Sequence, residues 1–453
     1  MKKLLATLLA STMALSAIAG LVACGGGDEE EEVKPISHEL AENLPEVTNS
    51  ETPLTDTTPV PATELKVWCP DGAIATYTKL YNEFKSADYM GGKYANVSVT
   101  FEAKPEGEVE TGLGTDASTG PDLFFFEAGQ IQNMVDKNFL APLSSTEEGA
   151  YYTKAISMRD SATTYSPVVY NGYCYAFPAT DDNGWFMWYN SDLLGEDDIK
   201  TLDGIVAKAK ELNKGIMFDY GNGWYISSFW QGAGCTMDYA GKKYVTDVDG
   251  EIGKKVGEAV WNYLTPANNK TADGETDVFI KPAKDGNSET ANGLNDETLI
   301  AGFQGSWIWN DIARNENIKP AKCPTYTLDG EQVKMGSFKG SKYCGVNAKR
   351  DNKSVAMALA NYFTSQHGQE VRFANTSAVP TNKVVAASDA VKENDVAMAL
   401  STQNAENGYA QLKQSSGFWD AMAAFGNGCA DGSTSKKDAS GKALKNLAKA
   451  MRK

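Results

Sequence analysis

The sequence predicts an α/β protein that folds into two lobes or domains. Runs with strand patterning alternate with amphipathic helical runs from Glu64 onward, and this alternation is typical of a mostly parallel sheet covered by helices. The chain has 453 residues, 42% of them hydrophobic, so it is too long for one compact core and too apolar to be disordered. In such α/β proteins, ligands bind beyond the carboxyl ends of the strands.

The first elements of the folded part read as a strand, a helix, two further strands and a second helix. The β-rich run ELKVWC begins at Glu64 and ends in the turn PDG. Apolar side chains recur at helical spacing over 74–87, and alternation over 96–103 predicts the second strand. The run GPDLFFFEAGQIQNMV over 120–135 predicts a third, buried strand that leads into a helix.

Later elements are predicted from the same two periodicities. Two apolar runs, 170–180 and 184–194, predict strands that cross from one lobe to the other. Four segments place apolar residues at i, i+3 or i+4 and therefore predict helices. They cover residues 202–214, 250–264, 351–365 and 440–453.

The amino-terminal residues predict export from the cytoplasm. Lys2 and Lys3 precede an apolar run that ends in small residues, so residues 1–23 read as a secretory signal peptide. The run ends in LVAC followed by three glycines, which resembles the lipobox of bacterial lipoproteins. That resemblance implies that Cys24 carries lipid, with acyl chains such as palmitate, and anchors the protein to the outer face of the cell membrane.

Residues 24–63 predict a solvated, extended tether. They contain an acidic run over 28–32 and five prolines, and aromatic residues are absent from them. Like charges repel and prolines stiffen the chain, so we expect this segment to hold the folded body away from the membrane.

Charge and histidine content exclude several function classes. Lys and Arg number 42 against 59 Asp and Glu, a formal net charge of -17, which repels nucleic acid and anionic lipid headgroups. His38 and His367 are the only histidines, too few for a histidine-ligated metal site or a Ser-His-Asp triad. We therefore expect no nucleic-acid partner, no metal and no cofactor.

The cysteines give no sign of a metal site either. Six of them follow Cys24 at wide spacing, without a CxxC pair. An extracellular location permits disulfides, but several of these cysteines lie in apolar runs, where buried free thiols are equally expected. The sequence leaves both states open.

Seven motifs in a fixed order carry a family resemblance. They are KVW with DG, TGPDLFFFEAGQIQNMVDKNFLAPL, YNGYCYAFPAT with WYNSDLL, GWYISSFWQGAGC, GFQGSWIWNDI, CGVNAK and SGFWDAM. With these motifs the chain resembles the maltose- and maltodextrin-binding proteins, within the extracellular solute-binding proteins that deliver carbohydrates to ABC importers. The resemblance implies a monomer with the two-lobe periplasmic-binding-protein fold, each lobe a sheet flanked by helices, with a ligand cleft between the lobes and an ABC permease as partner. It also implies lobes that are discontinuous in sequence, residues 64–180 with 336–380 and residues 181–335 with 381–453.

The aromatic residues fit carbohydrate recognition. A pyranose ring has a face of CH groups and a rim of hydroxyls, so sugar sites combine flat aromatic side chains with planar polar groups. Trp224, Trp307 and Trp419 fall where the family's motifs place a sugar-stacking aromatic, Tyr225 adjoins the first, and Phe126 stands where the family has Trp. Five further tryptophans are expected to pack in the core: Trp185, Trp188, Trp230, Trp261 and Trp309.

The resemblance also implies polar ligand contacts, with the family pattern only partly kept. Asp71 follows the first strand and matches an acid that the family uses on sugar hydroxyls. Glu127 and Gln130 follow the FFF strand near the family's Asp-Arg pair, which is absent as such. Asp181 and Asp182 stand near a family Glu, with one extra residue in the register.

These features predict the substrate-binding component of a carbohydrate ABC transporter, with maltodextrin-type gluco-oligosaccharides as ligands and no catalytic residues. Two other classes have the same composition: a surface adhesin that holds polysaccharide, and a glycoside hydrolase with a carboxylate pair. Against hydrolysis, the sequence places no isolated acid at an apolar strand end, where its pKa would be raised for proton donation.

Overall fold

The structure is a computed structural model. The residues that it describes are 36–41, 43–240, 243–270, 279–283, 287–312, 315–411 and 413–453. The predicted signal peptide, Cys24 and the first part of the predicted tether lie outside these ranges. Within them, no helix combines the length and the apolar composition needed to cross a membrane.

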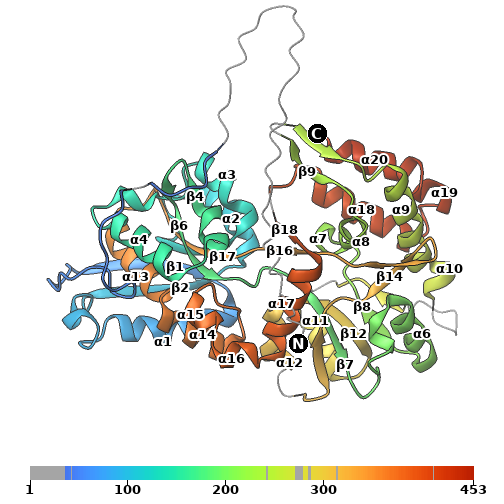
Figure 1. Ribbon diagram of the computed structural model, residues 1–453, viewed down its shortest axis with the longest axis horizontal. Coiled ribbons are helices and arrows are strands. Elements are labelled where there is room, and N and C mark those ends of the chain that lie inside the picture. Colours follow the sequence, from blue (N-terminus) through green and yellow to red (C-terminus); the bar gives the residue numbers. More distant parts are fainter. Residues whose placement is uncertain are drawn as a thin grey trace, which may run out of the picture. The chain divides into compact units, whose positions relative to one another are not determined.

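One five-stranded sheet forms the centre of the first lobe (Figure 1). In spatial order its strands are β2 (Val97–Ala103), β1 (Thr63–Cys69), β3 (Leu123–Glu127), β17 (Lys342–Val346) and β6 (Ala176–Thr180). Strand β1 runs parallel to β2 and β3, which confirms the three predicted strands at the start of the body. The run of phenylalanines in β3 is buried on both faces, as expected of a central strand covered by helices.

Helices pack around this sheet. They are α1 (Ile74–Phe84), α2 (Val109–Asp116), α3 (Ile131–Asp136), α4 (Gly149–Arg159), α5 (Ala162–Tyr165), α13 (Lys353–Phe363) and α14 (Gln366–Thr376). One of them, α13, is buried on all sides over 356–363. In α1, the side chains of Tyr77, Leu80, Tyr81 and Phe84 are buried at intervals of three or four residues, which is the periodicity that predicted this helix.

A second five-stranded sheet forms the centre of the other lobe. In spatial order its strands are β11 (Ile280–Lys281), β8 (Gly215–Met217), β12 (Leu299–Gln304), β7 (Phe186–Asn190) and β13 (Ile318–Ala321). Strands β11, β8 and β12 are parallel, whereas β7 pairs antiparallel with both β12 and β13. In the first sheet, β17 is likewise antiparallel to β3 and β6. Since β17 is antiparallel to both of its neighbours, β6 runs in the direction of β3, and since β7 is antiparallel to both of its neighbours, β13 runs in the direction of β12. Four of the five strands in each sheet therefore share one direction, which confirms the prediction of mostly parallel sheets. The exceptions, β17 and β7, are the strands with which the chain enters each sheet from the other lobe.

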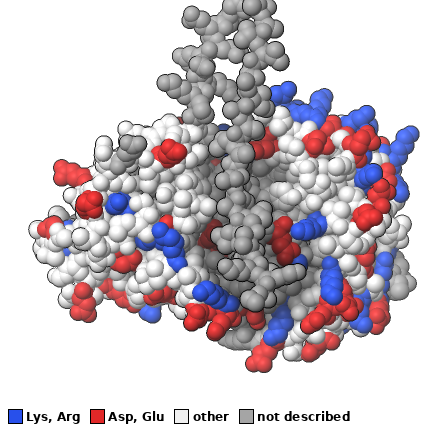
Figure 2. Space-filling view, viewed as in Figure 1, with Lys and Arg blue, Asp and Glu red and all other residues white. Residues whose placement is uncertain are grey.

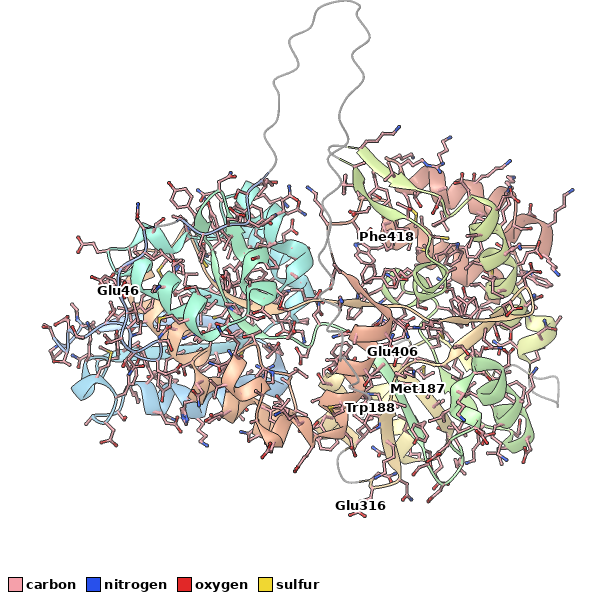
Figure 3. The ribbon with its side chains drawn as sticks, viewed as in Figure 1. Glu46, Met187, Trp188, Glu316, Glu406 and Phe418 are labelled. Carbon is pink, nitrogen blue, oxygen red and sulfur yellow. The ribbon has the colours of Figure 1, made fainter. Side chains whose placement is uncertain are left out.

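Strand β7 shows how the second sheet separates two cores. Met187 packs in the core on one face, and its neighbour Trp188 packs in the core on the other face, as the two-residue period of a strand requires (Figure 3). Of the five tryptophans expected in the core, Trp185, Trp188 and Trp230 are fully buried, and Trp261 and Trp309 are partly buried against it.

Helices and small strand pairs complete the chain. The longer helices of the second lobe are α6 (Leu202–Leu212), α9 (Glu251–Leu264), α11 (Asn287–Asn295), α17 (Asp395–Asn407), α18 (Phe418–Ala430) and α20 (Lys442–Met451). The short ones are α7 (Gly223–Ile226), α8 (Ser228–Gly232), α10 (Pro266–Asn269), α12 (Trp309–Ile312) and α19 (Lys436–Ala439). Between the lobes, α15 (Lys383–Ala386) packs on α14 of the first lobe, and α16 (Asp389–Lys392) connects it to α17. The strand pairs are β4 (Val169–Tyr170) with β5 (Tyr173–Cys174), β9 (Met237–Ala240) with β10 (Lys243–Thr246), β14 (Thr325–Leu328) with β15 (Glu331–Lys334), and β16 (Ser337–Lys339) with β18 (Gly408–Ala410).

The two main cores draw on discontinuous parts of the chain. Buried residues of the first core come from 65–179 and 343–363, and those of the second from 185–338 and 418–451. The predicted lobe bounds stay a prediction, but one detail differs from them. Phe338 packs in the second core, so the return segment joins the first core only after the chain has passed this residue.

The predicted tether is wrong for residues 37–62, which lie along the first lobe. We call these residues, apart from residue 42, the strap. The His38 ring donates a hydrogen bond from Nδ1 to the carbonyl of Val169 at 2.8 Å, and Ala41 donates to the carbonyl of Gly172 at 3.3 Å. Prolines keep the strap extended, and its backbone groups find partners on the body instead of water.

Apolar and charged side chains hold the remainder of the strap. Val47 is buried, and Leu54 and Val60 pack against the first core. The carboxylate of Glu51 accepts a hydrogen bond from the first backbone N–H of α14 at 2.6 Å, and Lys93 donates to the carboxylate of Asp56 at 2.9 Å. The strap is therefore an integral part of the first lobe.

We expect a chain that begins at Thr63 to melt at a temperature lower, by roughly 5 °C or more, than a chain that begins at Ser37. The shortened chain loses the packing of four apolar side chains, Leu40, Val47, Leu54 and Val60, each of which contributes up to about 1.5–3 kcal/mol when fully buried. Calorimetry of the two chains measures the difference. Equal melting temperatures would show that the strap adds nothing to the stability of the lobe.

The structure settles the state of the cysteines that the sequence left open. All six that it describes are buried free thiols. Burial raises the pKa of Cys69 and of Cys174 to about 12, so neither is a reactive thiolate. At the surface, acidic and basic side chains are interspersed over the face shown in Figure 2.

Candidate functional site

Two predicted tryptophans lie where an α/β fold places its ligands. Strands β8 and β12 are parallel neighbours. Trp224 lies in α7, which follows β8, and Trp307 lies in the short 3₁₀ helix η8 (Ser306–Ile308), which follows β12 directly. The parallel register brings the carboxyl ends of the two strands to one edge of the second sheet. The fold therefore brings together two residues that are 83 positions apart, the difference between 307 and 224.

The two indole rings stack on each other. Their centroids are 5.8 Å apart and their planes differ by 22°. The Trp307 Nε1 donates hydrogen bonds to Gln304 at 3.0 Å and to Asn287 at 2.9 Å, so this ring is held at its edge. The Trp224 Nε1 is buried without an acceptor among the described residues. Trp307 is thus the more firmly oriented of the pair.

Trp419 lies beside this pair through its backbone. A Cβ added at Gly223 would approach the carbonyl oxygen of Trp419 to 2.7 Å, so α7 and α18 pack closely and glycine is required at their contact. The half-buried Trp419 ring packs edge-on against Phe338 and Phe418, the latter labelled in Figure 3.

Two predicted aromatic contacts are core residues instead. Phe126 is fully buried and packs against Phe124 and Tyr343 in the first core, so its ring faces protein on all sides. Tyr225 is 5% exposed, and its hydroxyl donates to the side chain of Gln304 at 2.8 Å. The sequence pattern does not separate these two from surface aromatics, because the residue types are the same in both settings.

The first lobe contributes a buried lysine that the sequence analysis missed. Lys342 begins β17, and the antiparallel register places it opposite Glu127 of β3 and Thr180 of β6. Its ammonium lies 3.1 Å from the Glu106 carboxylate, in the 3₁₀ helix η3 (Glu106–Glu108), and 3.4 Å from the Asp182 carboxylate. The one available signal was a lone cation at the head of the apolar run KYCGV.

Asp182 joins the two lobes. Its carboxylate accepts hydrogen bonds from Thr180 at 2.6 Å and from Ser306 of the second lobe at 2.9 Å. Burial acts to raise the pKa of Asp182, but the Lys342 ammonium and these hydroxyls outweigh burial, so its pKa lies below the ordinary value. Both carboxylate oxygens are therefore engaged within the protein.

Asp181 and Glu127 are partly buried acids with few partners. Asp181 accepts a hydrogen bond from Ser341 at 2.7 Å, and Glu127 accepts one from Gln411 at 3.4 Å. Burial raises the pKa of both carboxyls. Glu127 ends the apolar strand β3, so the inference that no acid stands at an apolar strand end is wrong.

The other two predicted polar contacts, Gln130 and Asp71, differ in whether the side chain is free to contact a ligand. Gln130 is used within its own lobe: its Oε1 accepts from the backbone N–H of Glu110 at 2.9 Å, and its Nε2 donates to the Glu106 carbonyl at 2.7 Å. Asp71 lies in the 3₁₀ helix η1 (Asp71–Ala73), directly after β1, and its side chain is exposed. Of these two, Asp71 is open to a ligand.

Contacts between lobes unite the aromatic pair with the charged residues. The Lys342 ammonium lies 5.3 Å from the centroid of the Trp307 ring, a cation–π contact, and Ser306 bonds Asp182. Aromatic faces, hydroxyls, carboxylates and an ammonium therefore adjoin one another. Within the described residues, no group of three His, Cys, Asp or Glu side chains is arranged to hold a metal ion. Two surface cavities, of about 740 and 530 Å³, are lined by other parts of the second lobe.

Comparisons with solved structures identify the fold. The maltodextrin binding protein MalE1 from L. casei has a TM-score of 0.67 at 23% identity, covering 87% of this chain and 100% of that one. The GacH receptor of Streptomyces glaucescens has a TM-score of 0.69 at 18% identity, covering 86% and 99%. A cyclo/maltodextrin-binding protein has a TM-score of 0.63 at 20% identity, covering 86% and 96%. Identities this low show the shared fold alone, that of two-lobe periplasmic binding proteins.

Comparison with protein families is more specific. None of the curated proteins compared matches the chain. Residues 79–399, which are more than half of the chain, match the model of the family described as bacterial extracellular solute-binding protein. This is a family of binding proteins, not of enzymes, and its description places the protein outside the cytoplasm. The chain belongs to the bacterial extracellular solute-binding protein family.

Proposed function

We propose that this solute-binding protein is the substrate-binding component of a carbohydrate ABC importer, with a neutral gluco-oligosaccharide of the maltodextrin type as its ligand. The observation that carries the proposal is the stacked pair of Trp224 and Trp307 beside the Lys342 cluster. Indole rings cover the CH face of a pyranose, and buried polar groups hold its hydroxyls.

The charges of the cluster favour an uncharged ligand. The carboxylates of Glu106 and Asp182 are matched by the Lys342 ammonium and, at longer range, by the Arg372 guanidinium. A ligand with a charge of its own would leave one of these groups unbalanced in a buried setting, which is costly. Sugar hydroxyls instead donate and accept hydrogen bonds without adding charge.

The ligand contacts that we propose follow from exposure and position. Trp224, Trp307 and Trp419 supply aromatic faces, and Asp71 and Glu127 supply carboxyl groups. Four other predicted residues do not contact the ligand but hold the site together through hydrogen bonds within the protein. They are Asp181, Asp182, Tyr225 and Gln130. Phe126 is left out because its ring is enclosed in the core.

The fold relatives support the same ligand class. They include a maltodextrin binding protein, the GacH receptor solved in complex with acarbose, and a cyclo/maltodextrin-binding protein complexed with maltotetraose. These are ligands of those proteins, and they define the first compounds to test here.

Isothermal titration of the chain beginning at Ser37 with maltose, maltotriose and maltotetraose tests the proposal. We expect stoichiometric binding with a dissociation constant near micromolar, about 8 kcal/mol, and no change in the sugar on chromatography. Shorter sugars released during incubation would indicate a hydrolase, and weak binding to long polymer alone would indicate an adhesin. Either of these results would overturn the proposal.

We also propose that the protein is anchored through lipid on Cys24. Replacing Cys24 with Ala should release the mature protein from the membrane fraction without altering its sugar affinity, because the proposed ligand contacts all come from residue 71 onward in the sequence. Fractionation followed by immunoblotting measures the release. Variant protein that stays with the membranes as fully as the parent would contradict a lipid anchor.

A ligand that contacts both lobes should favour a more closed arrangement, because it binds that form better. Small-angle scattering of the chain beginning at Ser37 should show a smaller radius of gyration with saturating maltotetraose. The sugar should also add about 2.7 kcal/mol of stability at a hundredfold excess over Kd. An unchanged radius despite proven binding would exclude closure.

A further inference from the structure

Lys342 is placed unusually for a lysine. Its side chain is 8% exposed, and it begins a strand of the first sheet while its ammonium meets a tryptophan of the second lobe. Burial alone would lower the pKa of Lys342, but Asp182, Glu106 and Glu127 outweigh burial and raise it above the ordinary value. The group is therefore a permanently charged donor in a buried site.

The ammonium has more donors than the protein uses. A lysine ammonium carries three N–H groups. Among the described residues, two carboxylates form ion pairs with it, those of Glu106 at 3.1 Å and Asp182 at 3.4 Å, whereas the carboxylate of Glu127, opposite Lys342 in the sheet, acts from farther away. The ammonium also faces the Trp307 ring, which attracts the charge but offers no oxygen or nitrogen lone pair. One donor is thus left on the side of the indole.

The second lobe approaches this ammonium through two consecutive residues. Ser306 donates to Asp182 at 2.9 Å, and Trp307 lies under the Lys342 ammonium. A pyranose that stacks on Trp307 must therefore come within reach of Lys342, because the sugar and the ammonium would both lie next to the same indole ring. Its hydroxyl rim would lie outward from the ring, where the open donor is.

We propose that Lys342 is a ligand-contacting residue that donates an N–H to a hydroxyl of the sugar unit stacked on Trp307. This inference rests on the proposed function and names a polar contact of the same site. Because two carboxylates already neutralise the ammonium, it serves as a hydrogen-bond donor and does not select for anions. It selects for a hydroxyl at one position of the sugar ring.

The test compares Lys342→Met with the matched control Lys339→Met. Lys339 lies three positions earlier, in β16, and its Nζ donates to the carbonyl of Asn404 at 3.3 Å, within the second lobe. We expect Lys342→Met to bind maltose and maltotetraose roughly tenfold more weakly, which is about 1.4 kcal/mol, and Lys339→Met to bind within about twofold of the parent.

A panel of monodeoxy maltosides separates contact from support. If Lys342 donates to one hydroxyl, the maltoside that lacks this hydroxyl binds the parent protein more weakly than the complete sugar does. The same maltoside should bind Lys342→Met and the parent protein with equal affinity, because the contact is already absent. A merely structural lysine would instead weaken every sugar of the panel by the same factor. That result, or parent affinity in Lys342→Met, would overturn the inference.

Two further outcomes are informative. If Lys342→Met does not fold, Lys342→Arg keeps the charge facing Glu106 and Asp182, and the same panel should show altered discrimination at a single hydroxyl. An unaltered panel would count against the inference. If the parent protein binds no sugar of the panel, the proposed function and this inference are overturned together. If the parent protein binds sugar and neither Lys342→Met nor Lys342→Arg changes that binding, this inference alone is overturned.

Discussion

Replacing Arg159 with Ala should destabilise the first lobe by about 3–5 kcal/mol, the loss expected when one partner of a buried ion pair is removed. Arg159 and Asp160 have side chains that are 2% and 0% exposed, and Nε of Arg159 lies 3.2 Å from the Asp160 carboxylate. The variant keeps the buried carboxylate with the hydroxyl of Thr381, at 2.7 Å, and the side chain of Gln369 as its side-chain partners, and neither of them carries a charge. An unpaired buried charge is the main source of the loss.

The guanidinium also holds three parts of the lobe together. It donates to Asn361 of α13 at 2.8 Å, to Thr364 after that helix at 2.8 Å, and to the carbonyl of Ser50 in the strap at 3.4 Å. Each of these acceptors would lose its partner in Arg159→Ala, which adds to the cost.

Urea unfolding of Arg159→Ala beside Arg452→Ala measures the effect. Arg452 pairs with Asp249 at 2.6 Å at the surface, where loss of a pair costs up to about 1 kcal/mol. A loss of less than about 1 kcal/mol in Arg159→Ala would contradict the proposed role of the buried pair.

The loss in free energy of unfolding that Arg159→Ala causes should also depend on pH. Burial already raises the pKa of Asp160, and Arg159 opposes that shift, so its removal raises this pKa further. The folded variant then binds a proton more tightly than the unfolded chain does, so its stability falls as pH rises through the raised pKa. The difference from the parent should be smaller at about pH 5 than at about pH 8.

Replacing Trp307 with Ala should weaken binding of maltotetraose by roughly fivefold to more than a hundredfold, which corresponds to about 1–3 kcal/mol. The change removes the stacking surface and the ring that faces both Trp224 and Lys342. Because the ring is only half-buried, the free energy of unfolding without ligand should fall less than for a core tryptophan.

Trp185→Ala is the matched control. Trp185 is fully buried between Tyr225 and Phe303, so its truncation should cost roughly 3–5 kcal/mol of stability. Titration and urea unfolding on both variants separate the two roles. Unchanged sugar affinity in Trp307→Ala, with the protein folded, would remove Trp307 from the site.

Regular elements could be predicted because their periodicity follows from burial of one face. Residues 74–87 gave α1 and residues 440–453 gave α20, whose Leu444, Leu447 and Met451 are buried at helical spacing. The strap could not be predicted in this way. Its composition is that of a solvated segment, and it is held by backbone groups and by four scattered apolar side chains, which leave no periodic signal.

The sequence could predict some individual residues of the site, but not which residues surround them in the folded protein. Trp224 and Trp307 lie at the carboxyl ends of parallel strands, a location that the order of elements determines. Lys342 was missed because its neighbours depend on the register of an antiparallel strand that returns from the other lobe. Phe126 and Tyr225 were misplaced because exposure of an aromatic side chain is decided by which segment covers it.

The strap also determines how tension on the amino-terminal end would pass through the molecule. A pull at Ser37 acts first on the hydrogen bonds of His38 and Ala41 with the β4–β5 turn, and these can break one at a time as the strap peels away. Strand β1 follows the strap and pairs with β2 along seven residues, so it is loaded only after the strap has come free. Strand β17, which carries Lys342, lies two strands farther into the sheet than β1 and is thereby shielded from force. Peeling of the strap would instead lengthen the extended chain before the first lobe, without disturbing the strands of the sheet.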